Sequence, residues 1–540
     1  MKTIAIDVET TSNDPRIPAF NPWRGHRVFA VAVGDQFHRT QDLKFINELN
    51  PARWVGHNIK FDARFLHHHG VQLEGKLVDT RVLDHLVHEE EQHDLKNAAR
   101  RHLKGDWPED EAVKSWLKAA KTKDYGELPD RLVEPYCQAD ADRAKGLALV
   151  LPKKLDRAQR RLWRIEIKLT RVLLDAELRG VKVDVPKLKQ AQAGYTALLF
   201  KAVEELREIA GWDVDPTVHK EVVRLITDTL NLPVMRVTAK HGRPSFDHDA
   251  LKLYQSDEGL TSKQRRAASL LIACARADKL ITGFLIPWRE LMDADGVLHP
   301  EFNQVGTRTG RLSCSRPNMQ QITKRLKPLF IARDGYLLLY MDYSQIEYRF
   351  FAHYARDARV FAAYRENPNI DFHQFVADMI GINRDRAKTI NFGLLYGMGV
   401  AKLAASLGLS LEKADNLLRS YHHEFISVRP LTRMCSNVAK RRGYVHTLYG
   451  RRRHLRDFPF KALNSICQGG AGDLAKIKMV EVAEQYPEAK LLIGVHDELV
   501  WEVPERGAEA LAVELRKILE DVPELDVPVR VHWALGRRWE

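Results

Sequence analysis

The sequence predicts a multidomain protein that is α/β at its N-terminus and α+β at its C-terminus, with a helical region between. A chain of 540 residues exceeds one ordinary domain of roughly 100–200 residues. Strand patterns open the chain at 3–9 and 27–35, and helical patterns then run from about 79 to 150. Apolar strand patterns return at 335–343 and 490–504, with mainly helical sequence between them.

Three regions follow from these changes of pattern: 1–150, 151–295 and 296–540. The middle region is helix-rich and highly charged, and Gly180 is placed to end its first long helix. Residues 232–265 are polar with scattered Pro and Gly, which predicts loops between helices. A turn signal at Asp295-Gly296 precedes the third region.

Charge suggests an anionic partner. The chain has 84 Lys plus Arg against 72 Asp plus Glu, a net charge of +12, which suits nucleic acid but does not identify a chemistry. Hydrophobic residues make up 44% and charged residues 29%, and this balance excludes a wholly disordered chain.

Cysteine use and the N-terminus favour a reducing compartment. The cysteines are odd in number, widely spaced and form no CxxC pair, which argues against a disulfide framework or a cysteine zinc site. The start has no apolar signal-peptide core, and no run approaches the length of a membrane span. We therefore expect a cytoplasmic protein, or one acting in a host cytosol if a phage encodes it. The cysteines are Cys137, Cys274, Cys314, Cys435 and Cys467.

The first candidate site gathers four carboxylates. Asp7 and Glu9 lie two apart on a strand, so both leave one face. Asp62 follows in GHNIKFDARFL, and Tyr136 and Asp140 lie one helical turn apart in YCQADADRA. Four carboxylates can hold two metal ions about 3.5–4 Å apart for an in-line phosphoryl displacement. A lone DxE is more often a solvated strand edge, but three motifs in this order are a stronger signal.

These motifs resemble the DxE, NxxFD and YxxxD motifs of DEDD-type 3′–5′ exonucleases of the Tyr-bearing subgroup, over residues 1–145. The resemblance implies an RNase H-like fold for region 1–150. It also implies two divalent metals on Asp7, Glu9, Asp62 and Asp140, with Tyr136 orienting the attacking water.

Four further blocks lie in the last region. TRTGRLSCSRPNMQQI covers 307–322, and an apolar strand then delivers Asp342 at its end, before the helical pattern SQIEYRF. In RDRAKTINFGLLYGMG, two cations and two aromatic residues recur every four positions, a spacing that keeps them along one helix face. The fourth block places an HDE sequence at the tip of a predicted hairpin. Taken singly, most of these blocks are better explained as polar loops or helix caps.

Together the blocks resemble family A DNA polymerases, the DNA polymerase I family, with DYSQIEYR, RxxxKxxxFGxxYG and HDE as motifs A, B and C. The resemblance implies a right-hand polymerase, with 151–295 as a helical thumb region and 296–540 as palm and fingers. It implies polymerase metals on Asp342 and Asp497, and triphosphate contacts from Arg384 and Lys388, with Lys388 also as general acid.

Further roles follow from the same resemblance or from the basic run at 440–456, which we expect to track the template backbone. Phe460 stands where cellular members usually have Arg, four residues before the template-side Asn, so the chain looks more like phage members. The implied nucleotide contacts are Phe392, Tyr396, Glu347 and Gln345. The implied DNA contacts are Arg311, Asn318, Gln320, Asn464, Gln468, His496, Glu498, Arg451 and Arg452.

The sequence thus predicts a DNA-templated DNA polymerase that extends a primer 3′-OH with dNTPs and proofreads with a 3′–5′ exonuclease. The expected cofactor is Mg²⁺, two ions in the polymerase site and two divalent ions in the exonuclease site, with Mn²⁺ as an alternative. Expected partners are primer-template DNA and dNTPs, with no membrane, and the protein is expected to be a monomer. A processivity factor, helicase or single-strand binding protein stays open. No 5′-nuclease domain is expected before the exonuclease strand.

Two alternatives remain for comparison. One is a nucleic-acid-binding repair factor with an inactive palm, and the other is an exonuclease whose C-terminal part only binds DNA. Both predict loss of a metal carboxylate or of Lys388, and all of these residues are present. Primer extension with four dNTPs and Mg²⁺, compared with digestion without dNTPs, discriminates among the three.

Overall fold

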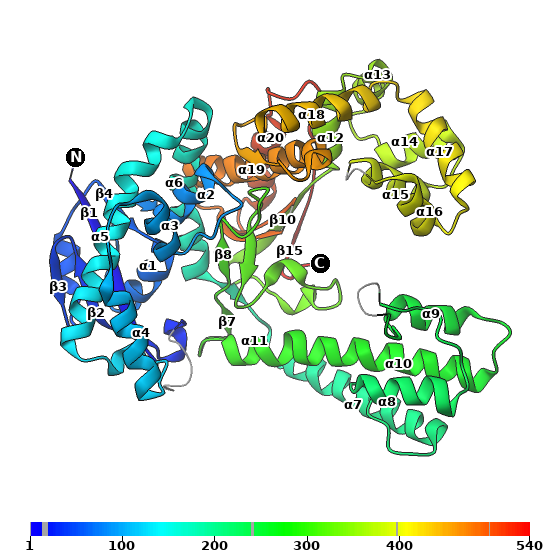
Figure 1. Ribbon diagram of the computed structural model, residues 1–540, viewed down its shortest axis with the longest axis horizontal. Coiled ribbons are helices and arrows are strands. Elements are labelled where there is room, and N and C mark those ends of the chain that lie inside the picture. Colours follow the sequence, from blue (N-terminus) through cyan, green and yellow to red (C-terminus); the bar gives the residue numbers. More distant parts are fainter. Residues whose placement is uncertain (1, 13–19, 239–241, 396–397, 496) are drawn as a thin grey trace. The chain divides into compact units, whose positions relative to one another are not determined.

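The computed structural model describes residues 2–12, 20–238, 242–395, 398–495 and 497–540. The chain divides into two compact units, one formed by 1–181 with 299–540 and the other by Lys182–Leu298 (Figure 1). The short strands β6 (Val181–Lys182) and β7 (Val297–Leu298) lie where the chain passes between the units. Among the described residues, none of the helices combines the length and the apolar character that crossing a membrane requires.

A mixed five-stranded sheet forms the N-terminal part, in the order β3-β2-β1-β4-β5. The central strand β1 pairs antiparallel with β2 and parallel with β4, and β5 continues the parallel half. Apolar alternation explains the placement of β1, because Ile4, Ile6 and Val8 enter one buried core while Ala5 packs beside Cys137. The bounds are β1 Thr3–Thr11, β2 Arg27–Val33, β3 Gln36–His38, β4 Arg53–Gly56 and β5 Lys76–Asp79.

Six helices accompany this sheet. The first contributes to the core beneath Ile4 and Ile6, and the fifth lies against β1 and β2. The sixth begins with a capping box in which Asp156 and Gln159 satisfy each other's backbone N–H groups, and it ends at Gly180, as the sequence predicts. The bounds are α1 Ile59–His68, α2 Thr80–Val87, α3 Leu95–His102, α4 Pro108–Ala120, α5 Asp130–Lys154 and α6 Arg157–Arg179.

An antiparallel four-stranded sheet, in the order β13-β14-β10-β15, forms the C-terminal part of the same unit. Asp342 lies opposite Glu498 in the β10–β14 register, near the end of β10. The strands and hairpin expected at 335–343 and 490–504 are therefore present. The bounds are β10 Tyr336–Tyr343, β13 Lys490–Val495, β14 Glu498–Pro504, β15 Val531–Gly536, with helices α19 Ala462–Gln485 and α20 Ala508–Glu520.

A helical segment separates β10 from α19 in the sequence (Figure 1). Its helices are α12 Ile346–Ala355, α13 Ala358–Glu366, α14 Phe372–Ile380, α15 Arg384–Leu395, α16 Val400–Leu407, α17 Leu411–Glu424 and α18 Val428–Arg442. The hairpin β11 (Tyr444–His446) and β12 (Arg452–His454) follows it, and β8 (Glu301–Asn303) pairs with β9 (Ser313–Ser315) ahead of β10.

The second unit is helical, as the sequence predicts for most of its length. Its core joins the first and fourth of its helices and includes Leu206, Tyr254 and Leu271. The prediction of loops over 232–265 is wrong in part, because Asp247 caps a helix that starts at His248 and buries Leu251 and Tyr254. The bounds are α7 Val185–Ala210, α8 His219–Arg224, α9 His248–Ser256, α10 Ser262–Leu280 and α11 Ile286–Leu291.

A buried charge network joins α6 to the C-terminal part of the first unit. Glu166 accepts hydrogen bonds from Arg451, from Lys476 at 2.8 Å and from Gln304 at 2.8 Å. The second partner of Arg451 is Asp473, with Nε 2.7 Å from Oδ1. Burial opposes ionisation of Glu166, but Lys476 and Arg451 outweigh it and lower the pKa of its carboxyl to about 2. The predicted DNA contact from Arg451 is therefore wrong, because that side chain is buried and pairs with Glu166 and Asp473 inside the protein.

Glu166→Ala should destabilise this unit strongly, because it leaves Arg451 and Lys476 without a shared buried carboxylate. Removing one partner from a buried ion network costs about 3–5 kcal/mol. Urea denaturation of the full chain measures the change in unfolding free energy. The matched control is Glu134→Ala on α5, where the side chain is exposed. Equal stability of the two variants would contradict a structural role for Glu166.

Candidate functional site

The first site is a cavity of about 260 Å³ beside β1. All four carboxylates predicted for the exonuclease line it, together with Tyr136. The structure therefore brings these predicted side chains together from β1, α1 and α5. The lining residues that carry polar chemistry are Asp7, Glu9, Asp62, Asp140, Tyr136, Tyr125, His57 and Lys123.

Rigid elements hold these carboxylates in place. Asp62 lies in the first turn of α1 and accepts a hydrogen bond from the backbone N–H of Val8 at 3.1 Å. The Cys137 thiol donates to Asp7, with Sγ 3.6 Å from the carbonyl oxygen and 3.7 Å from Oδ2. Burial raises the pKa of Cys137, so the thiol stays protonated as a donor. All five cysteines are free and buried.

The carboxylates repel one another across the cavity. Burial first, then the charges of Asp140, Glu9 and Asp62, raise the pKa of Asp7 well above its usual range. Burial is also the largest cause that raises the pKa of Glu9 to about 8 and that of Asp62 to about 8. The site therefore holds protons near neutral pH when no other cation is present.

Two basic residues that the sequence did not indicate partly compensate this charge. Lys96 and Arg143 both pair with Asp140, and each also contacts Asp110, at 3.1 and 3.0 Å. The Lys96 ammonium lies 4.3 Å from the centre of the Tyr136 ring. Lys96 comes from α3, 44 residues from Asp140 along the chain, so no local motif reveals the contact.

The donor set fits hard divalent cations. Four carboxylates around one cavity, three of them with raised pKa values, supply oxygen ligands that Mg²⁺ or Mn²⁺ prefers. Binding of a cation would replace the protons that the metal-free site retains. Asp7, Glu9, Asp62 and Asp140 are the residues that would hold the ions.

The second site lies at the end of β10. Asp342 is exposed there, and the backbone N–H of Tyr343 donates to the carbonyl of Asp497 at 3.1 Å. These contacts place Asp342, on β10, beside Asp497, which directly precedes the neighbouring strand β14. Although Asp342 reaches solvent, surrounding protein displaces part of its water, and this desolvation, with Asp497 and Glu498, raises its pKa to about 6. The paired carboxylates again suit a divalent cation.

Arg311 links this site to α12. Its guanidinium pairs with Glu347, and Nη2 also lies 3.5 Å from Oδ1 of Asp497. Burial raises the pKa of Glu347 and Arg311 opposes that shift. The predicted nucleotide and DNA residues Glu347 and Arg311 therefore meet beside a predicted metal ligand, although they are far apart in sequence.

The helix expected around Arg384 is present as α15. Arg384 pairs with Asp371, with Nε 2.6 Å from Oδ2, and Lys388 is exposed one turn later. The Gln345 amide donates to Asp371 at 2.9 Å and accepts from the Phe372 N–H at 3.0 Å, so both of its ends are used within the protein. The side chain of Phe392 and all of Tyr396 lie outside the described residues, so their predicted nucleotide contacts stay predictions.

Several of the residues predicted to contact DNA form hydrogen bonds within the protein. Gln320 donates to the carbonyl of Gly494 on β13 at 2.9 Å. Asn318 caps the short helix Met319–Gln321 by accepting from the Gln320 N–H. Glu498 accepts from Lys327 and from Trp539, both at 2.8 Å.

The remaining described residues that were predicted to contact DNA are half-buried. Arg452 pairs with Asp156 at 3.0 Å and covers the Tyr444 ring. Asn464 and Gln468 are half-buried on α19. His496 lies outside the described residues, so its predicted contact stays a prediction.

Comparison with known proteins decides the family. The family model for DNA polymerase family A matches residues 185–540, which is more than half of the chain. The chain belongs to DNA polymerase family A. A 3′–5′ exonuclease family model matches residues 1–156, so this family A polymerase carries an exonuclease domain at the N-terminal end of the chain. The predicted family and fold class are confirmed.

Curated relatives match different shares of this chain and of their own length. DNA polymerase I, thermostable, of Thermus filiformis is 34% identical over 71% of this chain and 49% of its own. DNA polymerase DpoZ of Salmonella phage PMBT28 is 27% identical over 99% of this chain and 96% of its own. The chain therefore spans about half the length of the thermostable relatives it matches, and nearly all of the phage protein.

A solved structure supports the same fold. The POL domain of Pol1 from M. smegmatis, in complex with DNA primer-template and dNTP, superposes with a TM-score of 0.82 at 27% identity. The match covers 99% of this chain and 95% of that one.

The metal-free protein should lose stability as pH rises from about 4 to above 8. Glu9 and Asp62 have pKa values of about 8 when folded, against about 4 when unfolded. A raised folded pKa contributes stability that is complete below the unfolded pKa and is lost as pH rises through the folded pKa. Thermal melting in a chelator, from pH 5 to 9, measures this dependence.

Asp62→Asn should weaken that pH dependence, because an amide has no proton to lose. The control is Asp35→Asn at the exposed β2–β3 turn of the same domain, which should leave the slope unchanged. Added Mn²⁺ should stabilise the wild-type protein most at high pH. An identical pH slope in the wild-type protein and Asp62→Asn would contradict the carboxylate crowding.

Proposed function

We propose that the protein extends a primer 3′-OH on a DNA template with dNTPs and removes terminal nucleotides with its 3′–5′ exonuclease. The observation that carries the proposal is the presence of two separate carboxylate sets, one around β1 and one at the ends of β10 and β14. The primer-template and dNTP bound to the M. smegmatis polymerase support the proposed substrates. We further propose that the protein acts as a monomer in a cytosol.

Divalent metals, with Mg²⁺ as our proposal and Mn²⁺ as the alternative, would supply activation of the attacking oxygen and stabilisation of the leaving group at both sites. In the polymerase site Asp342 and Asp497 would hold them. Exposed Lys388 and Arg384 on α15 would bind the triphosphate, because phosphate oxygens accept charge-assisted hydrogen bonds from ammonium and guanidinium groups. The Arg384–Asp371 pair has to open for this contact.

In the exonuclease site Tyr136 would orient the attacking water. Its ring lies under the Lys96 ammonium, and burial with the Asp140 and Glu9 charges raises the pKa of its hydroxyl. The hydroxyl therefore stays protonated, and can position a water by hydrogen bonding without acting as the base. Lys96 also forms an ion pair with Asp140.

Asp497→Ala should abolish primer extension and leave single-strand degradation intact, while Asp7→Ala should do the reverse. Loss of a group that only supports a metal ligand typically costs 10–100-fold, so loss of a ligand should cost more than about 100-fold. Gel assays with Mg²⁺, with and without dNTPs, measure both activities. If either single change removed both activities in a folded protein, the two-site proposal would fail.

Glu347→Ala should admit ribonucleotides. Glu347 lies beside Arg311 and near Asp497, where a side chain can exclude a 2′-hydroxyl from the sugar of a nucleotide. The dNTP-to-rNTP incorporation ratio should fall roughly 10–200-fold, the range for rejection of a small group by a pocket. Glu347→Gln keeps the size of the side chain and is the matched control, which should retain most discrimination. An unchanged ratio in Glu347→Ala with retained activity would refute the steric role.

A further inference from the structure

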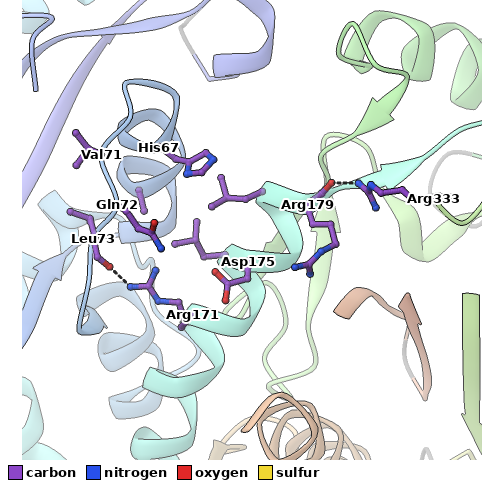
Figure 2. A pocket seen from close by; sticks show the side chains of 11 residues that line it. His67, Val71, Gln72, Leu73, Arg171, Asp175, Arg179 and Arg333 are labelled. Atoms are coloured by element: carbon purple, nitrogen blue, oxygen red, sulfur yellow. Dashed lines mark hydrogen bonds between the residues drawn. The ribbon is translucent and has the colours of Figure 1, made fainter. Parts of the chain in front are cut away.

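A second cavity, of about 430 Å³, lies away from both carboxylate sets. Figure 2 shows that α1 and the segment after it form one wall of the cavity. The C-terminal half of α6 forms the other wall, and Arg333 lies at one side. All of its lining residues belong to the first unit. None of them is among the residues that the sequence predicted for either reaction.

The lining is strongly basic. Arg171, Arg179 and Arg333 line the cavity with His67, whereas Asp175 is the one carboxylate among the described lining residues. Asp175 offsets one guanidinium and Glu502, which pairs with Arg333, offsets a second, so one positive charge remains among the three arginines. Convergent guanidinium groups in a concave site raise the local positive potential and attract an anion.

Two of the arginines are held by the protein. Arg171 donates to the carbonyls of Leu73 and Gly75, a contact that Figure 2 shows as a dashed line to Leu73. Arg333 pairs with Glu502 at 2.9 Å and donates to the carbonyls of Arg179 and Gly180 at the end of α6. That contact covers helix-end carbonyls that would otherwise repel an anion.

The Arg179 side chain differs from the other two. It is half-buried, and within the described part of the chain its guanidinium makes no hydrogen bond or ion pair that meets ordinary distance limits. Burial and the neighbouring Arg333 charge lower the pKa of Arg179, and the charges of Asp175 and Glu502 offset only part of that shift. A guanidinium desolvated beside a like charge is costly unless an anion compensates it.

We propose that this cavity binds a phosphate-bearing small molecule of nucleotide size, with Arg179 as its main phosphate ligand. Arginine presents several donors in a fixed fork that matches phosphate oxygens. The volume falls in the range of roughly 300–1,000 Å³ typical of small-molecule sites. Val71, Leu174 and Leu178 add an apolar wall for the organic part of the ligand.

Isothermal titration calorimetry on the full chain tests the site. A chelator in the buffer removes divalent metals, so that the two carboxylate sites catalyse no reaction during the titration. The probes are deoxyadenosine monophosphate, inorganic phosphate and deoxyadenosine. The wild-type protein should bind the monophosphate, and should bind deoxyadenosine at least tenfold more weakly. Binding of inorganic phosphate would show that the phosphate group alone suffices. If the monophosphate binds and inorganic phosphate does not, the apolar wall contributes to binding.

Arg179→Gln should weaken binding of the monophosphate at least tenfold. Gln72→Glu places a negative charge on an exposed lining residue and should weaken it as well, without disturbing the core. Arg164→Gln, exposed on the same helix and outside the cavity, is the matched control and should bind like the wild-type protein. Absence of monophosphate binding in the wild-type protein, equal binding of deoxyadenosine, or wild-type affinity in both cavity variants would overturn the proposal.

Discussion

Burial of neighbouring carboxylates on rigid elements, together with the repulsion between them, is the constraint on which both carboxylate sites depend. Two carboxylates in a loop could move apart. Asp7 and Glu9 cannot, because they lie on β1, the central strand of its sheet. The same holds for Asp342, since β10 is paired on both sides. The fold thereby builds sites that favour added positive charge, and the raised pKa values of Glu9, Asp62 and Asp342 express that preference.

The two centres differ in how the protein offsets this repulsion. Around Asp140 the compensation is internal and close, from Lys96 and Arg143. Around Asp497 it comes from Arg311, which also pairs with Glu347. A cation at either site would therefore compete with existing basic side chains for the carboxylates.

Local pattern was enough to predict the strands that carry Asp7, Glu9 and Asp342, whereas their role as metal ligands came from the resemblance to known families. The period of two places Asp7 and Glu9 on one face of β1, and an apolar run that ends in Asp342 predicts a strand with a ligand at its end. Gly180 ends α6 because it adopts a positive φ of 62°. These features depend on neighbours within a few residues.

Long-range partners could not be predicted from pattern. Arg451 lies in a basic run that suggests a DNA-facing surface, yet its partner Glu166 is 285 residues away and draws it into the core. In the sequence, nothing distinguishes Lys96 from other basic residues on helices, and only the tertiary structure brings it to Asp140. The helix α9 was missed because its polar composition hides two buried positions, Leu251 and Tyr254.

Proton release on metal binding tests the central claim most directly. Titration of the wild-type protein with Mn²⁺ at pH 7, in two buffers with different ionisation enthalpies, counts the protons released. Because Glu9 and Asp62 have pKa values of about 8, and because metal binding requires ionised carboxylates, at least about one proton should leave the exonuclease site. Asp62→Asn should release fewer. Tight Mn²⁺ binding at this site without proton release would contradict the account.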